Sequence, residues 1–166
     1  MRLPNRKPGK YTFPTFDPNM TQTKLDALQD KLDHLKTVSL PQAIKATQLA
    51  AENGDYSENA EYQVAKNRLR GLNRTIDELT YQINHAVIIP EPTDTTTVQV
   101  GHSVTVITSG QSITFKILGS SETNPTACVI SYQSPVGAAL LGHKVNDVVS
   151  VQLGAKIIKY TLVSIQ

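Results

Sequence analysis

Residues 53–86, NGDYSENAEYQVAKNRLRGLNRTIDELTYQINHA, decide the fold because they join a tight turn to a long helical repeat. The apolar residues of the repeat are spaced by three and four: Tyr62, Ala65, Leu69, Leu72, Ile76, Leu79, Ile83 and Ala86. Such spacing predicts one apolar face of an α-helix. Asn53-Gly54-Asp55 is a stop signal for a preceding helix, since glycine readily adopts the left-handed conformation found there. Ser57 or Asp55 can cap the second helix, which we expect from about Glu58 onward.

A first helical repeat lies before the turn. Leu25, Leu28, Leu32 and Leu35 form a seam of the kind found in coiled coils, and Thr21 or Thr23 can cap its helix. Pro41 lacks a backbone donor, so a kink or break is expected near Ser39-Leu40. The repeat then resumes with Ala43, Ile44, Ala46, Leu49 and Ala50.

Two apolar seams that flank a turn of a few residues must fold back on each other. The sequence therefore predicts an antiparallel coiled-coil hairpin over residues 20–89. Each arm of roughly 30 residues would extend about 45 Å at a helical rise of roughly 1.5 Å per residue. The turn is then an exposed tip, distant from the rest of the chain.

The segment before the hairpin, residues 1–19, is basic and contains four prolines: Pro4, Pro8, Pro14 and Pro18. This spacing of prolines blocks both a helix and a central strand, and it predicts an extended arm. Two arrangements are equally compatible with the sequence. The aromatic side chains Tyr11, Phe13 and Phe16 pack on the body of the protein, or the arm is loose.

After a polar linker, residues 90–97, the apolar period changes from about four to two. Residues 98–166 thus predict short strands, with hairpin turns at Ser109-Gly110 and Leu153-Gly154-Ala155. One short helix is expected, with Ser134 as its N-cap, Pro135 as its first residue and Gly142 at its end. The expected fold class is α+β: a long helical hairpin followed by a small antiparallel sheet with one helix.

Composition limits the function classes. The net charge of the 166 residues is +2, so any nucleic-acid contact must come from local clusters. The single cysteine, Cys128, cannot form a disulfide within the chain and is expected as a buried core thiol, which suits a cytoplasmic protein. No apolar run approaches the roughly 20 residues of a membrane span. The four histidines have no zinc-ligand spacing, and no nucleophile triad or phosphate loop can be assembled.

Three stretches resemble the GreA/GreB family of bacterial transcript-cleavage factors. The tip, Gly54-Asp55-Tyr56-Ser57-Glu58-Asn59-Ala60-Glu61-Tyr62, differs from the family form only by Tyr56 in place of leucine. Leu32-Asp33-His34-Leu35 precedes it, and Ser134-Pro135-Val136-Gly137-Ala138-Ala139-Leu140-Leu141-Gly142 follows in the C-terminal region. The resemblance spans about residues 20–166. It implies a C-terminal domain shaped like the FK506-binding proteins.

The resemblance also implies a function and a partner. Factors of this family insert the hairpin into the secondary channel of bacterial RNA polymerase as monomers. Carboxylates that match Asp55 and Glu58 help to hold Mg²⁺ in the polymerase active centre, and Ser57 is an accessory residue. The backtracked 3′ end of the nascent RNA is then cut off. The polymerase performs the reaction, so the factor is not itself an enzyme and has no cofactor of its own.

Further contacts follow from the same resemblance. A basic row on the second arm, Lys66, Arg68, Arg70 and Arg74, can contact RNA phosphates, or it is a solvated helix flank. Tyr56 stacks on an RNA base or fills the tip turn. Ser134 and Pro135 match the loop that docks on the polymerase. Ala51, Gln133 and Ala138 depart from residues common in the family, which bears on the strength of these contacts.

Other functions remain open at this point. The chain can be a regulator that occupies the polymerase channel without assisting cleavage, a role that usually goes with an altered tip. A peptidyl-prolyl isomerase is suggested only by the shape of the C-terminal domain, and shape alone does not confer activity. A structural adaptor would not explain an acidic tip.

Overall fold

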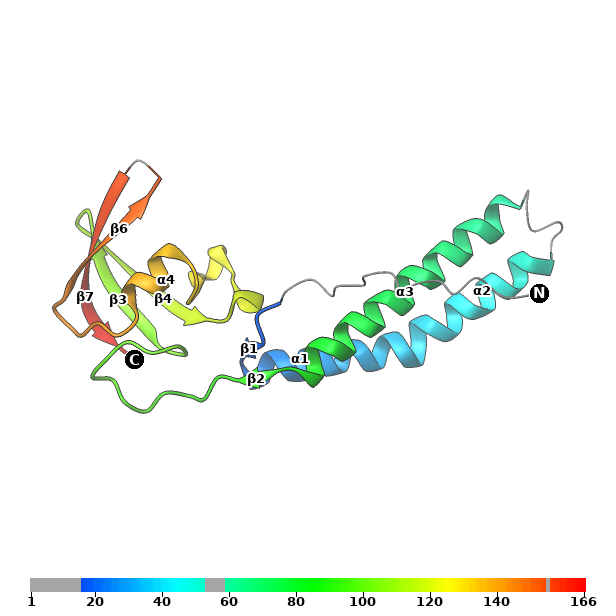
Figure 1. The fold of residues 1–166 in the computed structure, drawn as a ribbon, viewed down its shortest axis with the longest axis horizontal. Helices are drawn as coiled ribbons and strands as arrows, with labels where there is room; N and C mark the ends of the chain where they lie inside the picture. The colour runs from blue at the N-terminus through cyan, green and yellow to red at the C-terminus, as the bar shows by residue number, and fades with distance from the viewer. Residues whose placement is uncertain (1–15, 53–58, 155) are drawn as a thin grey trace, which may run out of the picture.

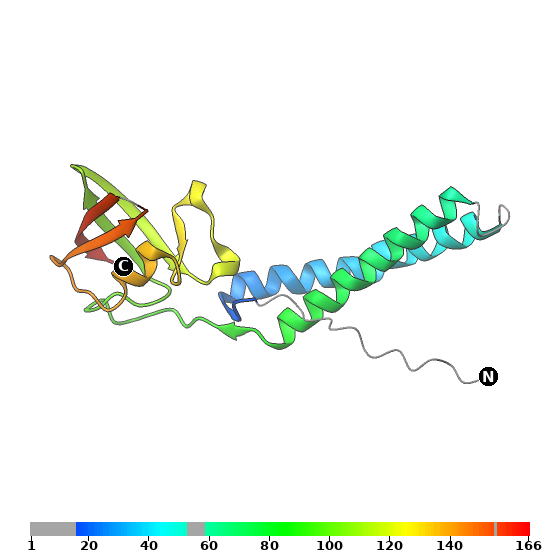
Figure 2. The same cartoon turned by 45° about the horizontal axis from the view of Figure 1, so that its top comes forward.

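The computed structural model describes residues 16–52, 59–154 and 156–166. A helical hairpin forms one end of the molecule, and a curled sheet with a short helix forms the other (Figures 1 and 2). The first arm contains α1 (Gln22–His34), the π-helical turn η1 (Leu35–Ser39) and α2 (Leu40–Glu52), and the second arm is α3 (Ala60–Asn84). This arrangement confirms the predicted α+β fold. No helix within these described ranges is long and apolar enough to cross a membrane.

The base of the hairpin, next to the sheet, is held by large aliphatic side chains. The buried members of this cluster are Met20, Leu28, Leu32, Ile76 and Leu79. Residues of both predicted seams therefore meet, as expected for two amphipathic helices that bury their apolar faces against each other. Thr21 is the N-cap of α1 and its hydroxyl accepts a hydrogen bond from Lys24 N–H, so the first of the two predicted caps is confirmed.

The first arm does not break at Pro41. The chain instead passes through the π-helical turn η1, in which the N–H of Leu40 donates to the carbonyl of Leu35, five residues back. The hydroxyl of Thr37 donates to the carbonyl of Asp33 at 2.7 Å, which satisfies a further acceptor in this segment. A π-helical turn is wider than an α-helical one. The predicted break is therefore absent, and a local widening of the helix just before Pro41 accommodates the proline.

The seam becomes thinner toward the tip. Ala43 and Ala50 are the buried residues of α2, whereas Leu49 is 53% exposed. On α3, Val64 is 70% exposed. Alanine side chains bring the helices together but bury little apolar area, so the tip end of the hairpin is held more weakly than its base.

A two-stranded parallel sheet ties the two ends of the hairpin together. Its strands are β1 (Asn19–Met20) and β2 (Val87–Ile88). The N–H of Val87 donates to the carbonyl of Pro18, and that of Ile89 donates to the carbonyl of Met20. The hairpin is therefore closed by backbone hydrogen bonds where it meets the rest of the chain (Figure 1).

The C-terminal domain is a five-stranded sheet with the order β5-β4-β3-β7-β6. Its elements are β3 (Ser103–Thr108), β4 (Gln111–Leu118), η2 (Ser120–Glu122), η3 (Pro125–Ala127), β5 (Val129–Ser131), α4 (Pro135–Leu140), β6 (Val148–Leu153) and β7 (Lys156–Ile165). The predicted turn at Ser109-Gly110 is confirmed, with both residues at positive φ, and Gly154 also has a positive φ between β6 and β7. Ala155 lies outside the described residues.

The sequence predicts a wholly antiparallel sheet, whereas the observed sheet is mixed. β5 runs parallel to β4, while the other neighbouring pairs are antiparallel. A parallel pair needs a crossover, and the segment with η2 and η3 supplies it. Cys128 ends η3 with a φ of 53° and is partly exposed, so its prediction as a buried core thiol is wrong. β5 begins only after this left-handed residue.

Helix α4 covers one face of the sheet. Leu140 is fully buried against a core of strand residues, among them Val104, Val106, Ile117 and Leu162. Gly137 approaches β5 so closely that a Cβ atom there would lie 2.1 Å from the carbonyl oxygen of Ser131. This close contact fixes the position of the short helix, and with it the residues at its N-terminus.

Candidate functional site

α2 ends and α3 begins at the end of the hairpin that is distant from the sheet, and the predicted acidic tip falls between these two helices in the sequence (Figure 1). Asp55, Tyr56, Ser57 and Glu58 lie outside the described residues, so their predicted roles remain predictions. The structure describes the two flanks of this segment. They are Glu52, the last residue of α2, and Asn59, which precedes α3.

Asn59 joins the two arms directly below the tip. Its side-chain oxygen accepts a hydrogen bond from the N–H of Tyr62 at 3.0 Å, which caps α3. Its side-chain nitrogen donates to the carbonyl of Ala50 on α2 at 2.6 Å. The side-chain amide of Asn59 thus supplies an acceptor to one arm and a donor to the other. The N-cap of α3 is thus Asn59, and the prediction of Ser57 or Asp55 as the cap is wrong.

The predicted basic row divides between two faces of α3. Lys66, Arg70 and Arg74 follow each other in steps of four and share a face, whereas residues two apart do not. Arg68 instead lines an open groove of about 580 Å³ between the arms, together with apolar residues such as Ala46 and Val64. The sequence alone contained the spacing that separates Arg68 from the other three.

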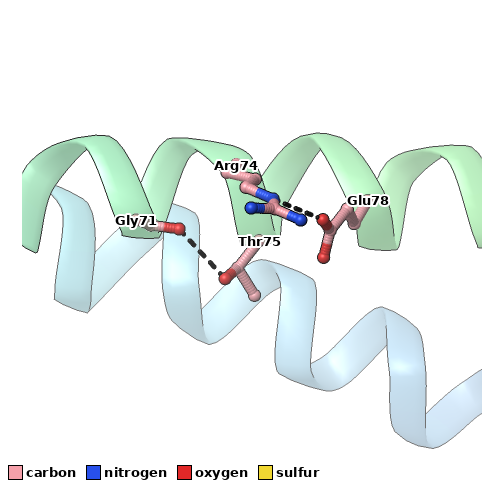
Figure 3. Close-up of polar contacts among 4 residues, drawn as sticks. All are labelled: Gly71, Arg74, Thr75 and Glu78. Atoms are coloured by element: carbon pink, nitrogen blue, oxygen red, sulfur yellow. Dashed lines mark hydrogen bonds and ion pairs between the residues drawn. The ribbon is translucent and has the colours of Figure 1, made fainter. Parts of the chain in front are cut away.

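Two cations of this face have partners within the helix. The ammonium of Lys66 lies 5.3 Å from the centre of the Tyr62 ring, a cation–π contact one turn from the start of α3. Arg74 Nε pairs with Glu78 Oε1 at 2.7 Å, as Figure 3 shows beside the bond from the Thr75 hydroxyl to the Gly71 carbonyl. Arg74 is therefore partly neutralised. Exposed Arg70 is closer to the tip and better placed for an external anion.

Ser134 and Pro135 form the N-terminus of α4. The Ser134 hydroxyl accepts from the N–H of Gly137 at 3.1 Å and donates to the carbonyl of Ser131 at 2.6 Å. Both of its hydrogen-bonding functions therefore serve the fold. Pro135 is exposed next to it, as are Gln133 and Ala138. A partner at this surface would thus meet Pro135 and its exposed neighbours, while Ser134 holds the turn that presents them.

Sequence reasoning missed a group of residues that joins the N-terminal segment to the C-terminal domain. Phe16 packs edge-on against Tyr81 of α3 at 5.6 Å between ring centres, so the first of the two predicted arrangements holds for this aromatic residue. Tyr11 and Phe13 lie outside the described residues. Asp17 and Thr21 reach across to the C-terminal domain instead. Nothing local in the sequence signals these contacts, because the partners are more than 100 residues apart.

Comparison with known proteins gives consistent matches over nearly the whole chain. The N-terminal domain of transcription elongation factors matches residues 19–88, and the C-terminal domain of the GreA/GreB transcription elongation factors matches residues 92–166. Transcription elongation factor GreA of Macrococcus caseolyticus is 39% identical over 136 residues, which cover 81% of this chain and 86% of that protein. The factor GreA of Syntrophotalea carbinolica is 37% identical and covers 88% and 94%.

A solved structure is similar as well. The GreA factor homolog 1 (Gfh1) of Thermus thermophilus is 27% identical, with 89% of this chain and 97% of that chain covered and a TM-score of 0.40.

Proposed function

The chain belongs to the GreA/GreB family of transcription elongation factors, and from this premise we propose that it stimulates the cleavage of backtracked RNA by bacterial RNA polymerase. In this proposal the hairpin enters the secondary channel of the polymerase. The tip brings Asp55 and Glu58 to the active centre, and the polymerase supplies the remaining catalytic groups. Arrested complexes then resume synthesis from the new RNA 3′ end.

The position of the two helix ends that flank the acidic pair in the sequence supports the proposal. α2 ends at Glu52 and α3 begins just after Asn59, at the end of the hairpin remote from the sheet (Figure 1). The 25 residues of α3 span about 37 Å at roughly 1.5 Å per residue, so this end of the hairpin is far from the hydrophobic core of the C-terminal domain. Asp55 and Glu58 lie in the sequence between these two helix ends. They are suited to a site on another molecule.

The chemistry assigned to the tip is that of added metal ligands. Mg²⁺ needs octahedral oxygen coordination and is commonly bound by one or two carboxylates, with water and phosphate oxygens as further ligands. When bound between polymerase, tip and RNA, it would activate water and stabilise the leaving oxygen. The part of this chain is to bring Asp55 and Glu58 to that position. Asn59 supports this role by tying α3 to Ala50 of α2 next to the tip.

The remaining predicted contacts fit around this centre. Lys66 and Arg70 lie on one face of α3 behind the tip and are proposed to contact phosphates of the extruded RNA. Arg74 is expected to contribute less, since Glu78 already pairs with it. Pro135, presented by the Ser134 cap, is proposed to dock on the outside of the polymerase, which would fix the hairpin at the channel entrance.

The test is RNA release from a polymerase stalled in a backtracked state, in the presence of Mg²⁺. Asp55→Asn and Glu58→Gln keep the size of each side chain and remove its charge. We expect each to lower the stimulated cleavage rate by about 100-fold, the scale of a lost contact to developing charge in a transition state. Glu52→Gln is the matched control, because this exposed carboxylate lies beside the tip at the end of α2.

The outcomes separate the candidate functions. The proposal is supported if the wild type and Glu52→Gln stimulate RNA release and the two tip variants do not. If the chain binds the polymerase and slows synthesis without releasing RNA, it is a channel-binding regulator instead. Equal cleavage by wild type and both tip variants would rule out the role of the acidic pair.

A further inference from the structure

The N-terminal segment of residues 16–21 is hydrogen-bonded to the C-terminal domain through two carboxylates. Asp17 Oδ2 accepts from the N–H of Ser120 at 2.8 Å, and Asp17 Oδ1 accepts from the hydroxyl of Tyr132 at 3.2 Å. Glu122 Oε2 accepts from the N–H of Thr21 at 2.8 Å, and its Oε1 accepts from the Thr21 hydroxyl at 2.6 Å. Each carboxylate comes from one part of the molecule and its donors come from the other.

Asp17 is set up as an ionised acceptor. Burial alone would raise the pKa of its carboxyl, but hydrogen bonds from Ser120 and Asn19 outweigh burial and lower the pKa below its ordinary value. The side-chain amide of Asn19 adds a second link, since it donates both to Asp17 at 3.0 Å and to the Tyr132 hydroxyl at 2.9 Å. Hydrogen bonds to a charged group are stronger than those between neutral groups.

A close backbone contact lies at the centre of these bonds. A Cβ atom on Gly119 would lie 1.9 Å from the carbonyl oxygen of Asn19. The φ of Gly119 is −68°, which any residue adopts without strain. Glycine is therefore required here by the approach of the two segments and not by its own backbone conformation. Strand β1, which contains Asn19, also pairs with β2, so a contact on this segment acts on both ends of the hairpin.

We propose that Asp17, Thr21, Gly119 and Glu122 form an interdomain clamp that fixes the direction of the hairpin relative to the docking surface of the C-terminal domain. These are positioning residues: they act through the orientation of α1 and α3 and do not touch RNA or the metal. The proposal rests on the function proposed above, in which one partner is bound at two places.

The location of the clamp explains why the orientation matters. The hydroxyl of Tyr132 donates a hydrogen bond to Asp17. Tyr132 is followed in the sequence by exposed Gln133 and then by the Ser134–Pro135 turn at the start of α4. Residues Phe16, Asp17 and Tyr132 line one small cavity together with Gln133. The hydrogen bonds at the base limit the movement of the tip, because a small rotation at the base moves the end of a long hairpin by many ångströms. A two-site ligand binds most tightly when the spacing of its sites is fixed in advance.

Two variants test the clamp in different ways. Glu122→Ala removes the acceptor for both donors of Thr21, and Gly119→Ala inserts a methyl group between the segments. Gly71→Ala is the matched control for the second variant, because a Cβ on this glycine of α3 would meet no atom within 4 Å. Asp77→Ala is the control for the first, since it removes an exposed carboxylate of α3.

The first measurement concerns the free, full-length protein. Spin labels are attached to the substituted cysteines of Asn67→Cys in α3 and Ser150→Cys in β6, in a Cys128→Ser background. Pulsed electron paramagnetic resonance then reports the distance between the hairpin and the C-terminal domain. Both labelled positions are exposed. We expect a single narrow distribution for the unmodified clamp and both controls, and a broad one for Glu122→Ala and Gly119→Ala. Narrow distributions in both clamp variants would overturn the proposal.

The second measurement is binding to bacterial RNA polymerase. If the correct orientation falls to about a tenth of the population, the apparent affinity falls about tenfold. We expect this loss in both clamp variants and in neither control, with cleavage largely recovered at saturating protein. A broadened distance distribution with unchanged affinity would also overturn the positioning role. Absence of polymerase binding by the wild type would instead refute the proposed function, while the distance measurement still decides whether the clamp exists.

Discussion

The two ends of the hairpin are built differently. At the base, Leu28, Leu32, Ile76 and Leu79 are buried in one cluster, and hydrogen bonds join the hairpin to the C-terminal domain. At the tip end, alanines form the seam, Leu49 and Val64 are largely exposed, and the amide of Asn59 links the arms. The base, which is proposed to fix the direction of the hairpin, is thus the more stable end. The end proposed to enter the polymerase has the thinner seam. The difference suggests that a slender tip is compatible with function only because the base is firmly held.

The largest effect is expected from truncation in the base. Leu79→Ala removes a buried side chain and leaves a cavity, so it should lower the free energy of unfolding by about 2–5 kcal/mol. Leu49→Ala, at a side chain that is 53% exposed near the tip, should cost less than about 1 kcal/mol. Urea denaturation of both variants measures the contrast. Equal losses would show that the two ends are equally well packed.

Loss of the hydrogen bonds of Asn59, which link the arms below the tip, should lower the free energy of unfolding by an intermediate amount. Asn59→Asp keeps an acceptor for the N–H of Tyr62 but loses the donor to the Ala50 carbonyl, whereas Asn59→Ala loses both bonds. We expect a loss of about 1 kcal/mol for the first and about 2 kcal/mol for the second, from typical values for a hydrogen bond and a helix cap. Hydrogen exchange at the Tyr62 amide separates the two roles: it should accelerate in Asn59→Ala and stay slow in Asn59→Asp. Fast exchange in both would argue against the cap.

A smaller effect of the opposite sign is expected in the middle of the second arm. Gly71 lies within α3, and a Cβ there would meet open space. Gly71→Ala should therefore raise the free energy of unfolding by about 0.5–1 kcal/mol, because alanine loses less backbone freedom in a helix than glycine does. Thermal unfolding of this variant gives the sign directly. A lower melting temperature would mean that the position is more crowded than the structure indicates.

The smallest effect is expected from the exposed ion pair on the same helix. Glu78→Gln removes the partner of Arg74, and pairs of this kind contribute about 0.3–0.5 kcal/mol. In the RNA cleavage assay the same variant should leave activity unchanged, since Arg74 keeps its charge and the pair is exposed. A clear fall in cleavage with unchanged stability would contradict this interpretation.

Much of the fold could be predicted because its signals are local. The steps of three and four between Tyr62 and Ile83 are a property of a single helix, and so is the cap that Thr21 provides for α1. The turn at Ser109-Gly110 likewise depends on two adjacent residues. The candidate tip, Asp55 to Glu58, was found in the same way, from a short motif between two helical repeats.

The errors of sequence interpretation arose where two local solutions compete. Pro41 can break a helix or be taken up by a wider turn, and the surrounding helix decided for the π-helical turn η1. Asp55, Ser57 and Asn59 are all good caps, and Asn59 prevailed because its amide also reaches Ala50 on the opposite arm. Neither choice can be made without knowing what lies beside the residue.

The sequence by itself determined the two helical arms, the strands and turns of the C-terminal domain, and the family, since these follow from periodicity and short motifs. Only the tertiary structure decided that β5 runs parallel to β4, that Arg68 faces the groove between the arms, and that Asp17 and Glu122 bond across the two parts. The physical reason is the range of the interactions. Helices and turns are stabilised by neighbours a few residues away, whereas the direction of the hairpin depends on partners more than 100 residues apart.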